Sequence, residues 1–222
     1  MLLGVENRIM KKYTHIVWDF NGTLFDDVDA GIASVNKMLG DRGISQIEDR
    51  EQYQKIFKFP IIDYYRDLGF DFAAESYDEL APIWVELYNE NSRSSVLQSG
   101  AVDAIKFFES RGLSQILLSA TELNMLKGQV SGLGIGDYFS EIYGLDNIHA
   151  YSKKQLAVRW KEENPNAVPL FVGDTEHDAE VAKAVGADCI LVACGHQSRD
   201  ILERCGCVVC DDLYKLIEYI DA

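Results

Sequence analysis

The chain has 222 residues, of which 47% are hydrophobic, and its formal net charge is −15 at pH 7. This length allows one substantial hydrophobic core and leaves room for a smaller second domain. The negative charge and the lack of a basic stretch exclude nonspecific nucleic-acid binding. No apolar run approaches membrane-spanning length and no segment at the amino end resembles a targeting signal. We therefore expect a cytoplasmic protein that has neither nucleic acid nor membrane as a partner.

The first motif is the segment 18–24, which reads WDFNGTL. The apolar run before it, HIVW at 15–18, is typical of a buried strand, and Gly22 with Thr23 indicates a turn. Asp19 is thus expected at the carboxyl end of a strand, where open α/β sheets place their chemistry. An ordinary strand that ends in a polar turn explains this segment equally well when it is taken alone.

Residues 28–96 lack strand-like runs and instead show the pattern of amphipathic helices, for example in the spacing of Ile32, Val35, Met38 and Leu39. We expect this segment to form an all-helical cap domain. It would be inserted into a core domain made of residues 1–27 and 97–222. The polar and small residues at 25–29 and 91–100 are suited to hinges between the two domains.

From Gly100 onward short apolar runs alternate with helical patterns, which is typical of strands and helices packed around a parallel sheet. Strands are predicted at 115–118, 170–172, 189–192 and 207–210, with a weaker one near 141–143. Helices are predicted at 102–110, 154–163, 179–185 and 213–220. The chain is therefore predicted to be an α/β protein, with a Rossmann-like three-layer core and a helical cap.

All five cysteines lie in the last part of the chain, at 189, 194, 205, 207 and 210. Their odd number and their spacing do not match a paired zinc site. We expect buried free thiols instead, which are typical of a reducing compartment.

Polar residues follow three of the predicted strands. Asp19 follows the first, Ser119 follows the apolar run 116–118, and Asp174 and Asp178 follow the run 170–172. Parallel strands bring these ends to one edge of the sheet. We therefore expect the four side chains to form one site.

Nucleophilic phosphoryl transfer requires a carboxylate that attacks phosphorus, a divalent cation, a hydroxyl and an ammonium group. Asp19 would be the nucleophile and Asp174 a metal ligand. Either Lys153 or Lys154, which precede the helix leading to Asp174, would supply the ammonium group. Mg²⁺ suits such a site, since it prefers one or two carboxylates together with waters and a substrate phosphate.

These motifs, in this order and with an insertion after the first, resemble the haloacid dehalogenase (HAD) superfamily of hydrolases. The resemblance is to the phosphoglycolate-phosphatase-like branch with a helical cap. It covers nearly the whole chain from about Lys12, and its motifs are the segment 19–24, Ser119, Lys153 and the segment 173–178. It implies a HAD-like core, a magnesium cofactor and a small phosphorylated metabolite as substrate.

The resemblance also implies a role for each matching residue. Asp19 would form an aspartyl-phosphate and Ser119 would bind phosphate. Lys153, with Lys154 as a competitor, would neutralise the phosphate. The implied metal ligands are Asp19, the backbone carbonyl of Asn21, Asp174 and, directly or through water, Asp178.

Several of these residues also have a purely structural explanation. Ser119 could cap the helix that follows it, and Asp178 could cap the helix at 179–185. The two lysines could be a solvated pair, and His177 is expected only to pack or to form a hydrogen bond.

The resemblance departs at Asn21, where phosphatases of the superfamily carry a second aspartate that protonates the leaving oxygen and then activates water. An amide does not exchange a proton near neutral pH, and losing such a group typically lowers the rate by about 10² to 10⁴. Three hypotheses remain. The chain is a magnesium-dependent phosphatase of reduced turnover, a catalytically impaired metal- and phosphate-binding or regulatory protein, or a hydrolase or transferase that acts on something other than a phosphate monoester.

Substrate contacts are expected at Gly22, Thr23 and Ala120, which lie next to the motifs. A cap of this type supplies selective contacts, so the segment 57–60 is a candidate specificity loop. Its Lys58 would meet an anionic substrate tail. An ordinary surface lysine is the alternative.

Overall fold

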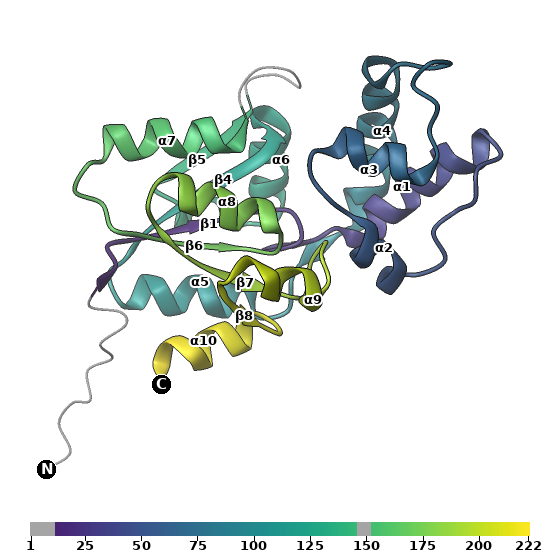
Figure 1. The fold of residues 1–222 in the computed structure, drawn as a ribbon. Coiled ribbons are helices and arrows are strands. Elements are labelled where there is room, and N and C mark those ends of the chain that lie inside the picture. The colour runs from purple at the N-terminus through teal and green to yellow at the C-terminus, as the bar shows by residue number, and fades with distance from the viewer. Residues whose placement is uncertain (1–11, 146–151) are drawn as a thin grey trace, which may run out of the picture.

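The core is a six-stranded parallel sheet in a computed structural model that describes residues 12–145 and 152–222. The strand order is β5-β4-β1-β6-β7-β8. The strands are β1 (His15–Trp18), β4 (Ser114–Glu122), β5 (Glu141–Leu145), β6 (Pro169–Gly173), β7 (Asp188–Val192) and β8 (Val208–Cys210). Figure 1 shows this sheet between two layers of helices, which confirms the predicted three-layer core.

The two faces of the sheet are covered by different helices. One face packs against α5 (Ala101–Ser110), α6 (Leu123–Gly132) and α10 (Leu213–Asp221), and the other against α7 (Lys153–Glu163) and α8 (Glu176–Ala184). In the central strand β1, residues 16–18 are all apolar because both faces of the sheet are covered there. Ile16 and Trp18 belong to the first buried cluster and Val17 to the second, so both faces of the strand are covered.

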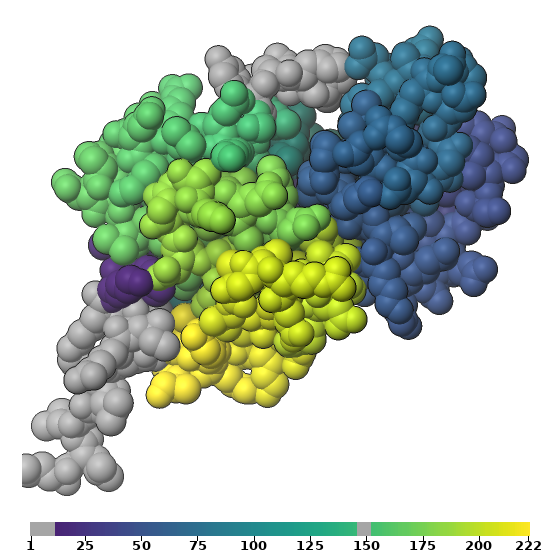
Figure 2. Space-filling model, viewed as in Figure 1, coloured from purple at the N-terminus to yellow at the C-terminus, as the bar shows by residue number. Residues whose placement is uncertain are grey.

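The cap consists of α1 (Val28–Asp41), α2 (Arg50–Ile56), α3 (Ile61–Leu68) and α4 (Tyr77–Asn91). These helices surround a buried cluster of their own, which includes Val35, Met38, Tyr53 and Leu80. In Figure 2 the cap, in blue, rests against the green and yellow core. The helical cap expected from the sequence is therefore present.

The two predicted hinge segments lie side by side. Their short strands β2 (Phe25–Asp26) and β3 (Val96–Leu97) pair in an antiparallel ladder, with Phe25 opposite Leu97. The chain therefore leaves the core and returns to it at one place. A short helix α9 (Arg199–Leu202) and three 3-10 helices, at Ser92–Ser94, Gly136–Tyr138 and Glu203–Cys205, complete the described elements.

Several local expectations differ from the structure. Strand β4 continues beyond Ser119 to Glu122, so this serine lies within a strand. Helix α8 begins at Glu176 because Thr175 and Asp178 form a capping box at its start. The five cysteines are free, but only Cys210 is buried, so the expectation of burial is wrong for the other four. No helix in the described part of the chain is long and apolar enough to cross a membrane.

Candidate active site

A cavity of about 280 Å³ lies between the carboxyl edge of the sheet and the cap. The core side of the cavity includes Asp19 and Asp174, which follow β1 and β6, and Ser119, which lies in the last half of β4. Asp19 is held at the end of β1 because its backbone N–H donates to the carbonyl of Val172 in the neighbouring strand at 2.9 Å. The site therefore lies where the sheet topology predicted it.

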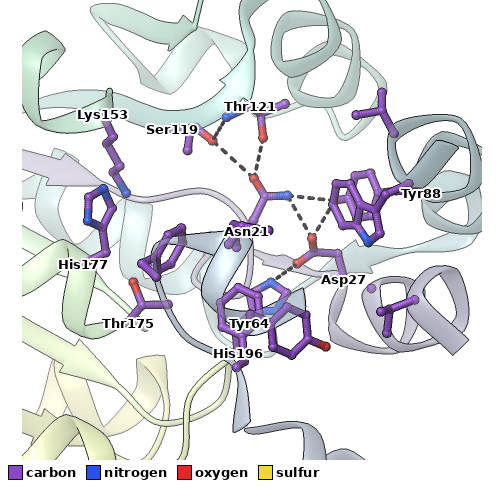
Figure 3. Close-up of a pocket in the computed structure, with 18 of the residues that line it drawn as sticks. Asn21, Asp27, Tyr64, Tyr88, Ser119, Thr121, Lys153, Thr175, His177 and His196 are labelled. Carbon is purple, nitrogen blue, oxygen red and sulfur yellow. Dashed lines mark hydrogen bonds and ion pairs between the residues drawn. The ribbon is translucent and has the colours of Figure 1, made fainter. Parts of the chain in front are cut away.

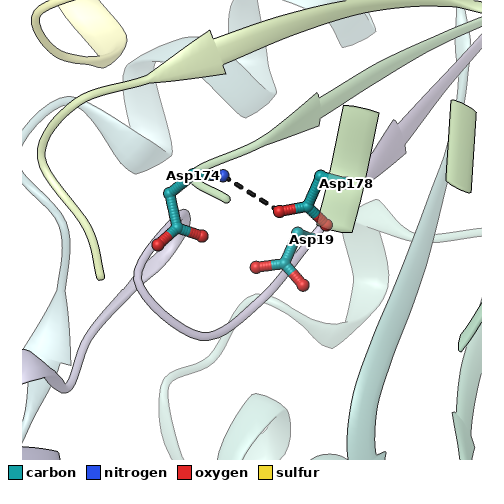
Figure 4. A group of neighbouring side chains, drawn as sticks. All are labelled: Asp19, Asp174 and Asp178. Atoms are coloured by element: carbon teal, nitrogen blue, oxygen red, sulfur yellow. Dashed lines mark hydrogen bonds between the residues drawn. The ribbon is translucent and has the colours of Figure 1, made fainter. Parts of the chain in front are cut away.

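Three carboxylates converge at this edge, as Figure 4 shows. Asp19, Asp174 and Asp178 each place an oxygen within 4.8 Å of the others. Burial raises the pKa of Asp19 to about 6. Burial, together with the neighbouring Asp19 and Asp178, raises the pKa of Asp174 well above its ordinary value. The cluster is thus an excess of negative charge in a place poorly reached by water.

Lys153 is the lysine that reaches this cluster. Its ammonium group donates to both Asp19 and Asp178, and the residue is only 4% exposed. Burial alone would lower the pKa of Lys153, but Asp178 and Asp19 raise it above the ordinary value, so the ammonium stays charged. Lys154 is exposed. Of the two candidates, Lys153 is the one at the site.

The oxygen atoms around the cluster fit a divalent cation. The Thr23 hydroxyl lies 3.1 Å from an oxygen of Asp19 and 2.8 Å from an oxygen of Asp174, but it has one proton and donates to only one of them. Within the described segments, no group donates to the backbone carbonyl of Asn21. Three carboxylates also face the single ammonium of Lys153. Hard oxygen ligands whose carboxylates outnumber the nearby ammonium group are what Mg²⁺ prefers.

Two glycines allow the surrounding loops to approach Asp174. Gly22 has a φ of +75°, and a Cβ added there would lie 2.2 Å from a carboxylate oxygen of Asp174. A Cβ on Gly195 would lie 2.1 Å from the same oxygen. Larger residues would displace the carboxylate, so both positions require glycine.

The side chain of Asn21 is fixed by hydrogen bonds on both sides of its amide (Figure 3). Its nitrogen donates to a carboxylate oxygen of Asp27 at 2.9 Å and to the hydroxyl of Tyr88 at 2.8 Å. Its oxygen accepts from the hydroxyls of Thr121 at 2.6 Å and Ser119 at 3.2 Å. Asn21 therefore connects the core strand β4 with Asp27, which precedes the cap, and with Tyr88 of the cap helix α4.

Asp27 and His196 form a buried pair beside Asn21. Asp27 is 1% exposed and accepts hydrogen bonds from the backbone N–H of Gly22 at 2.8 Å and from the Tyr88 hydroxyl at 2.5 Å. The His196 ring lies 3.2 Å from Asp27 on one side and 2.8 Å from the Tyr53 hydroxyl on the other. Burial would lower the pKa of His196, but Asp27 and Asp174 raise it to about 9. This pair ties two cap helices to the core.

The sequence interpretation did not include Asp27, Tyr88, Thr121 or His196. A signal existed for His196, because the segment 193–196 follows the predicted strand at 189–192 and so reaches the same sheet edge. The backbone N–H of His196 donates to Asp174 at 2.6 Å, which places this loop directly at the acidic cluster.

The structural explanations of the predicted residues have mixed outcomes. Ser119 does not cap α6, because Glu122 occupies the N-cap position. Asp178 takes part in the capping box of α8 and also binds Lys153. His177 packs as expected, since its ring stacks on Phe59 with 4.7 Å between centroids.

The four expected substrate contacts lie in different places. Ala120 lines the cavity, whereas Gly22 and Thr23 lie behind Asp174 and support it. Lys58 does not line the cavity, because its ammonium group pairs with Asp67 on the outside of the cap.

The cap side of the cavity is mainly aromatic. Its rings include Tyr53, Phe57, Phe59, Tyr64, Trp84 and Tyr88. Several of them pack on one another, for example Phe57 on Tyr64 with 5.3 Å between centroids and Trp84 on Tyr88 with 4.7 Å. A charged floor on the core thus faces an apolar roof on the cap.

Comparison with known proteins gives phosphoglycolate phosphatases among the relatives. The chain is 26% identical over 211 residues to a phosphoglycolate phosphatase of Pseudomonas fluorescens, a match that covers 91% of this chain and 78% of the relative. It is 26% identical over 215 residues to phosphoglycolate phosphatase 1 of Pseudomonas aeruginosa, with 93% and 79% covered.

Solved structures share the fold at low sequence identity. A haloacid dehalogenase-like hydrolase of Streptococcus pneumoniae superimposes with a TM-score of 0.73 at 16% identity, covering 94% of this chain and 99% of that one. Protein tyrosine kinase A of Mycobacterium tuberculosis gives a TM-score of 0.79 at 18% identity, covering 96% and 100%. The family model for haloacid dehalogenase-like hydrolases matches residues 16–192. The chain therefore belongs to the haloacid dehalogenase-like hydrolases and resembles their phosphoglycolate phosphatases.

Proposed function

We propose that this chain is a magnesium-dependent phosphatase that hydrolyses a small phosphorylated metabolite through an aspartyl-phosphate on Asp19. The observation that carries this proposal is the buried contact of Asp19 with Lys153, beside Asp174 and facing a cavity. A carboxylate so placed is held in its charged, attacking form by the ammonium group. The phosphatases among the relatives support a phosphate ester as the substrate.

In the first step an oxygen of Asp19 would form a bond to phosphorus while the bond from phosphorus to the leaving oxygen breaks. Lys153 and the Ser119 hydroxyl would bind the transferring phosphate. In the second step water would attack phosphorus and release Asp19 as a carboxylate. A bound Mg²⁺, held by Asp19, Asp174 and the carbonyl of Asn21, would screen the negative charges of carboxylate and phosphate.

Asn21 limits both steps. Its amide neither donates a proton to the leaving oxygen nor accepts one from water. Both of its polar atoms are also engaged, with Asp27 and Tyr88 on one side and with Ser119 and Thr121 on the other. We therefore expect slow turnover, with faster reaction for esters whose leaving group needs no proton.

The amide at position 21 also favours a second candidate function. With no group at position 21 that transfers a proton, the protein would act as a magnesium- and phosphate-binding regulator without useful turnover. In that case the acidic cluster and Lys153 would bind the ligand, and the cap would signal that it is bound.

Phosphoenzyme trapping separates the two candidates. The protein is incubated with Mg²⁺ and acetyl phosphate, and mass spectrometry of peptides locates the phosphoryl group. Phosphate release is measured in parallel with a broad panel of phosphate esters. We expect phosphorylation at Asp19 that is absent from the isosteric variant Asp19→Asn. The phosphatase proposal is overturned if the wild-type protein gives neither phosphoenzyme nor phosphate release, and magnesium-dependent binding of phosphate would then support the regulator.

A further inference from the structure

The cap wall of the cavity carries aromatic rings but no fixed positive charge. Among the described residues that line the cavity, Lys153 is the only lysine or arginine, and it belongs to the core and is bound to Asp19 and Asp178. On the cap, Lys58 pairs with Asp67 and Arg66 with Asp63, and neither cation lines the cavity. A carboxylate on the leaving group would therefore find no partner in this wall.

The charges that are present would repel such a carboxylate. Asp27 and Glu122 also line the cavity, in addition to the acidic cluster on the floor. His196 also lines the cavity as a cationic group, but its ring is already hydrogen-bonded to Asp27 and Tyr53. Burying a second anion here would cost free energy without a compensating ion pair.

The rings form a surface suited to a flat apolar group. Phe59 stacks on His177 at the border of cap and core, and Trp84 stacks on Tyr88 deeper in the cap. The cavity of about 280 Å³ exceeds the roughly 150 Å³ that holds benzene in an apolar protein cavity. A six-membered ring with a phosphate attached therefore has room.

Tyr64 adds a ring but no accessible polar group to this apolar wall. The residue is 3% exposed and lines the cavity, and its hydroxyl is buried without a hydrogen-bond partner among the residues that the structure describes. A buried hydroxyl without a partner is unfavourable, and most such groups in proteins are satisfied. Its oxygen exposes less than 1 Å² of surface, so the ring of Tyr64 borders the cavity while the hydroxyl does not face it.

We propose that the substrate is a phosphate monoester of an uncharged aromatic alcohol, whose ring packs against the cap rings. This deepens the proposed function and rests on it, since the phosphate is taken to bind at Asp19 and Lys153. It also separates this chain from an enzyme for 2-phosphoglycolate, whose leaving group carries a carboxylate.

Binding of non-hydrolysable phosphonates to the wild-type protein in Mg²⁺ tests the substrate class without requiring turnover. Isothermal titration calorimetry compares benzylphosphonate with phosphonoacetate, and also with 4-carboxybenzylphosphonate, which adds one charge to the same ring. We expect benzylphosphonate to bind about tenfold more tightly than either carboxylate, as desolvation of an unpaired charge implies. Equal or tighter binding of the carboxylates overturns the assignment.

The two proposals fail separately, since a protein that never releases phosphate still ranks the phosphonates, and an active phosphatase that prefers phosphonoacetate contradicts only the aromatic substrate.

Discussion

The floor and the roof of the cavity are built in opposite ways. On the floor, charged and polar side chains bind one another. Lys153 pairs with Asp19 and Asp178. The amide of Asn21 has four hydrogen-bond partners, which are Asp27, Tyr88, Ser119 and Thr121. On the roof, aromatic rings pack edge to face or stacked, and the Tyr64 hydroxyl has no partner in the described chain.

The difference matches the demands of two tasks. Groups that stabilise developing charge must be fixed before the reaction and shielded from water, which a dense polar network on rigid strand ends provides. A wall that selects a leaving group can be more permissive, since each ring contact is worth only about 0.5 to 1.5 kcal/mol and several contribute together. Changes on the floor should therefore alter rate by orders of magnitude, and changes on the roof should alter affinity by small factors.

Removal of the metal or of Asp174 should have the largest effect. Chelation of Mg²⁺ should abolish phosphate release, and Asp174→Asn should lower it by about 10³-fold or more, because the cation stabilises transition-state charge by several kcal/mol. At a hundred times its dissociation constant, Mg²⁺ should stabilise the wild-type protein by about 2.7 kcal/mol. Thermal unfolding with and without Mg²⁺ measures this difference.

In the absence of Mg²⁺, Asp174→Asn should not be less stable than the wild-type protein. Burial and neighbouring carboxylates disfavour the charged form of Asp174, so Asp174→Asn should be at least as stable as the wild-type protein without Mg²⁺. Asp188→Asn is the matched control, because Asp188 starts β7 at the other end of the sheet and pairs with Lys12. Equal stabilisation of both variants by Mg²⁺ would show that Asp174 is no ligand.

Asn21→Asp should have the next largest effect, an increase in the rate of phosphate release. A carboxyl group restores proton transfer, which is typically worth about 10² to 10⁴ in rate. Steady-state kinetics with one ester measures the change. Asn21→Ala, which removes the amide without adding a carboxyl group, should show no increase, and a failure of Asn21→Asp to gain activity would place the defect elsewhere.

Asn21→Asp should also lower the stability of the folded protein in a pH-dependent way. The amide nitrogen lies 2.9 Å from a carboxylate oxygen of Asp27, so the new carboxyl group should have a raised pKa in the folded protein. A raised pKa means that the folded state holds the proton more tightly than the unfolded state. The variant should therefore match the wild-type protein in acid and lose stability as the pH rises above about 4, where the unfolded group ionises. Urea unfolding at several pH values measures this trend.

The floor was largely predictable from sequence, and the reason is topological. Asp19 and Asp174 each follow an apolar run that forms a central parallel strand, and neighbouring parallel strands end at one edge. Lys153 begins α7, which packs against the sheet beside α8, and its choice over Lys154 follows from which side of the first helical turn faces the sheet. Local patterns therefore fixed these positions to within one residue.

The links between cap and core were not predictable in this way. Asp27, Tyr88 and His196 meet only because the cap docks on the loop after β7, through contacts such as the hydrogen bond from the side chain of Gln54 to the carbonyl of Gly195 at 2.7 Å. No periodicity encodes how two domains dock. The position of Lys58 was unpredictable for the same reason. Phe57 and Phe59 of the segment 57–60 line the cavity, but the sequence did not show that Lys58 lies on the other side of this segment.

Lys58→Ala should have the smallest effect, and for that reason it tests the contrast between floor and roof. The Lys58 ammonium pairs with Asp67 outside the cavity, and exposed ion pairs are worth about 1 kcal/mol or less. Activity and KM should match the wild-type values, as they should in Lys55→Ala, where an exposed lysine of α2 pairs with Glu51. If KM rises in Lys58→Ala but not in Lys55→Ala, the ammonium must turn inward when substrate binds. The roof would then hold a cation, and an anionic leaving group would become the better fit to this cavity.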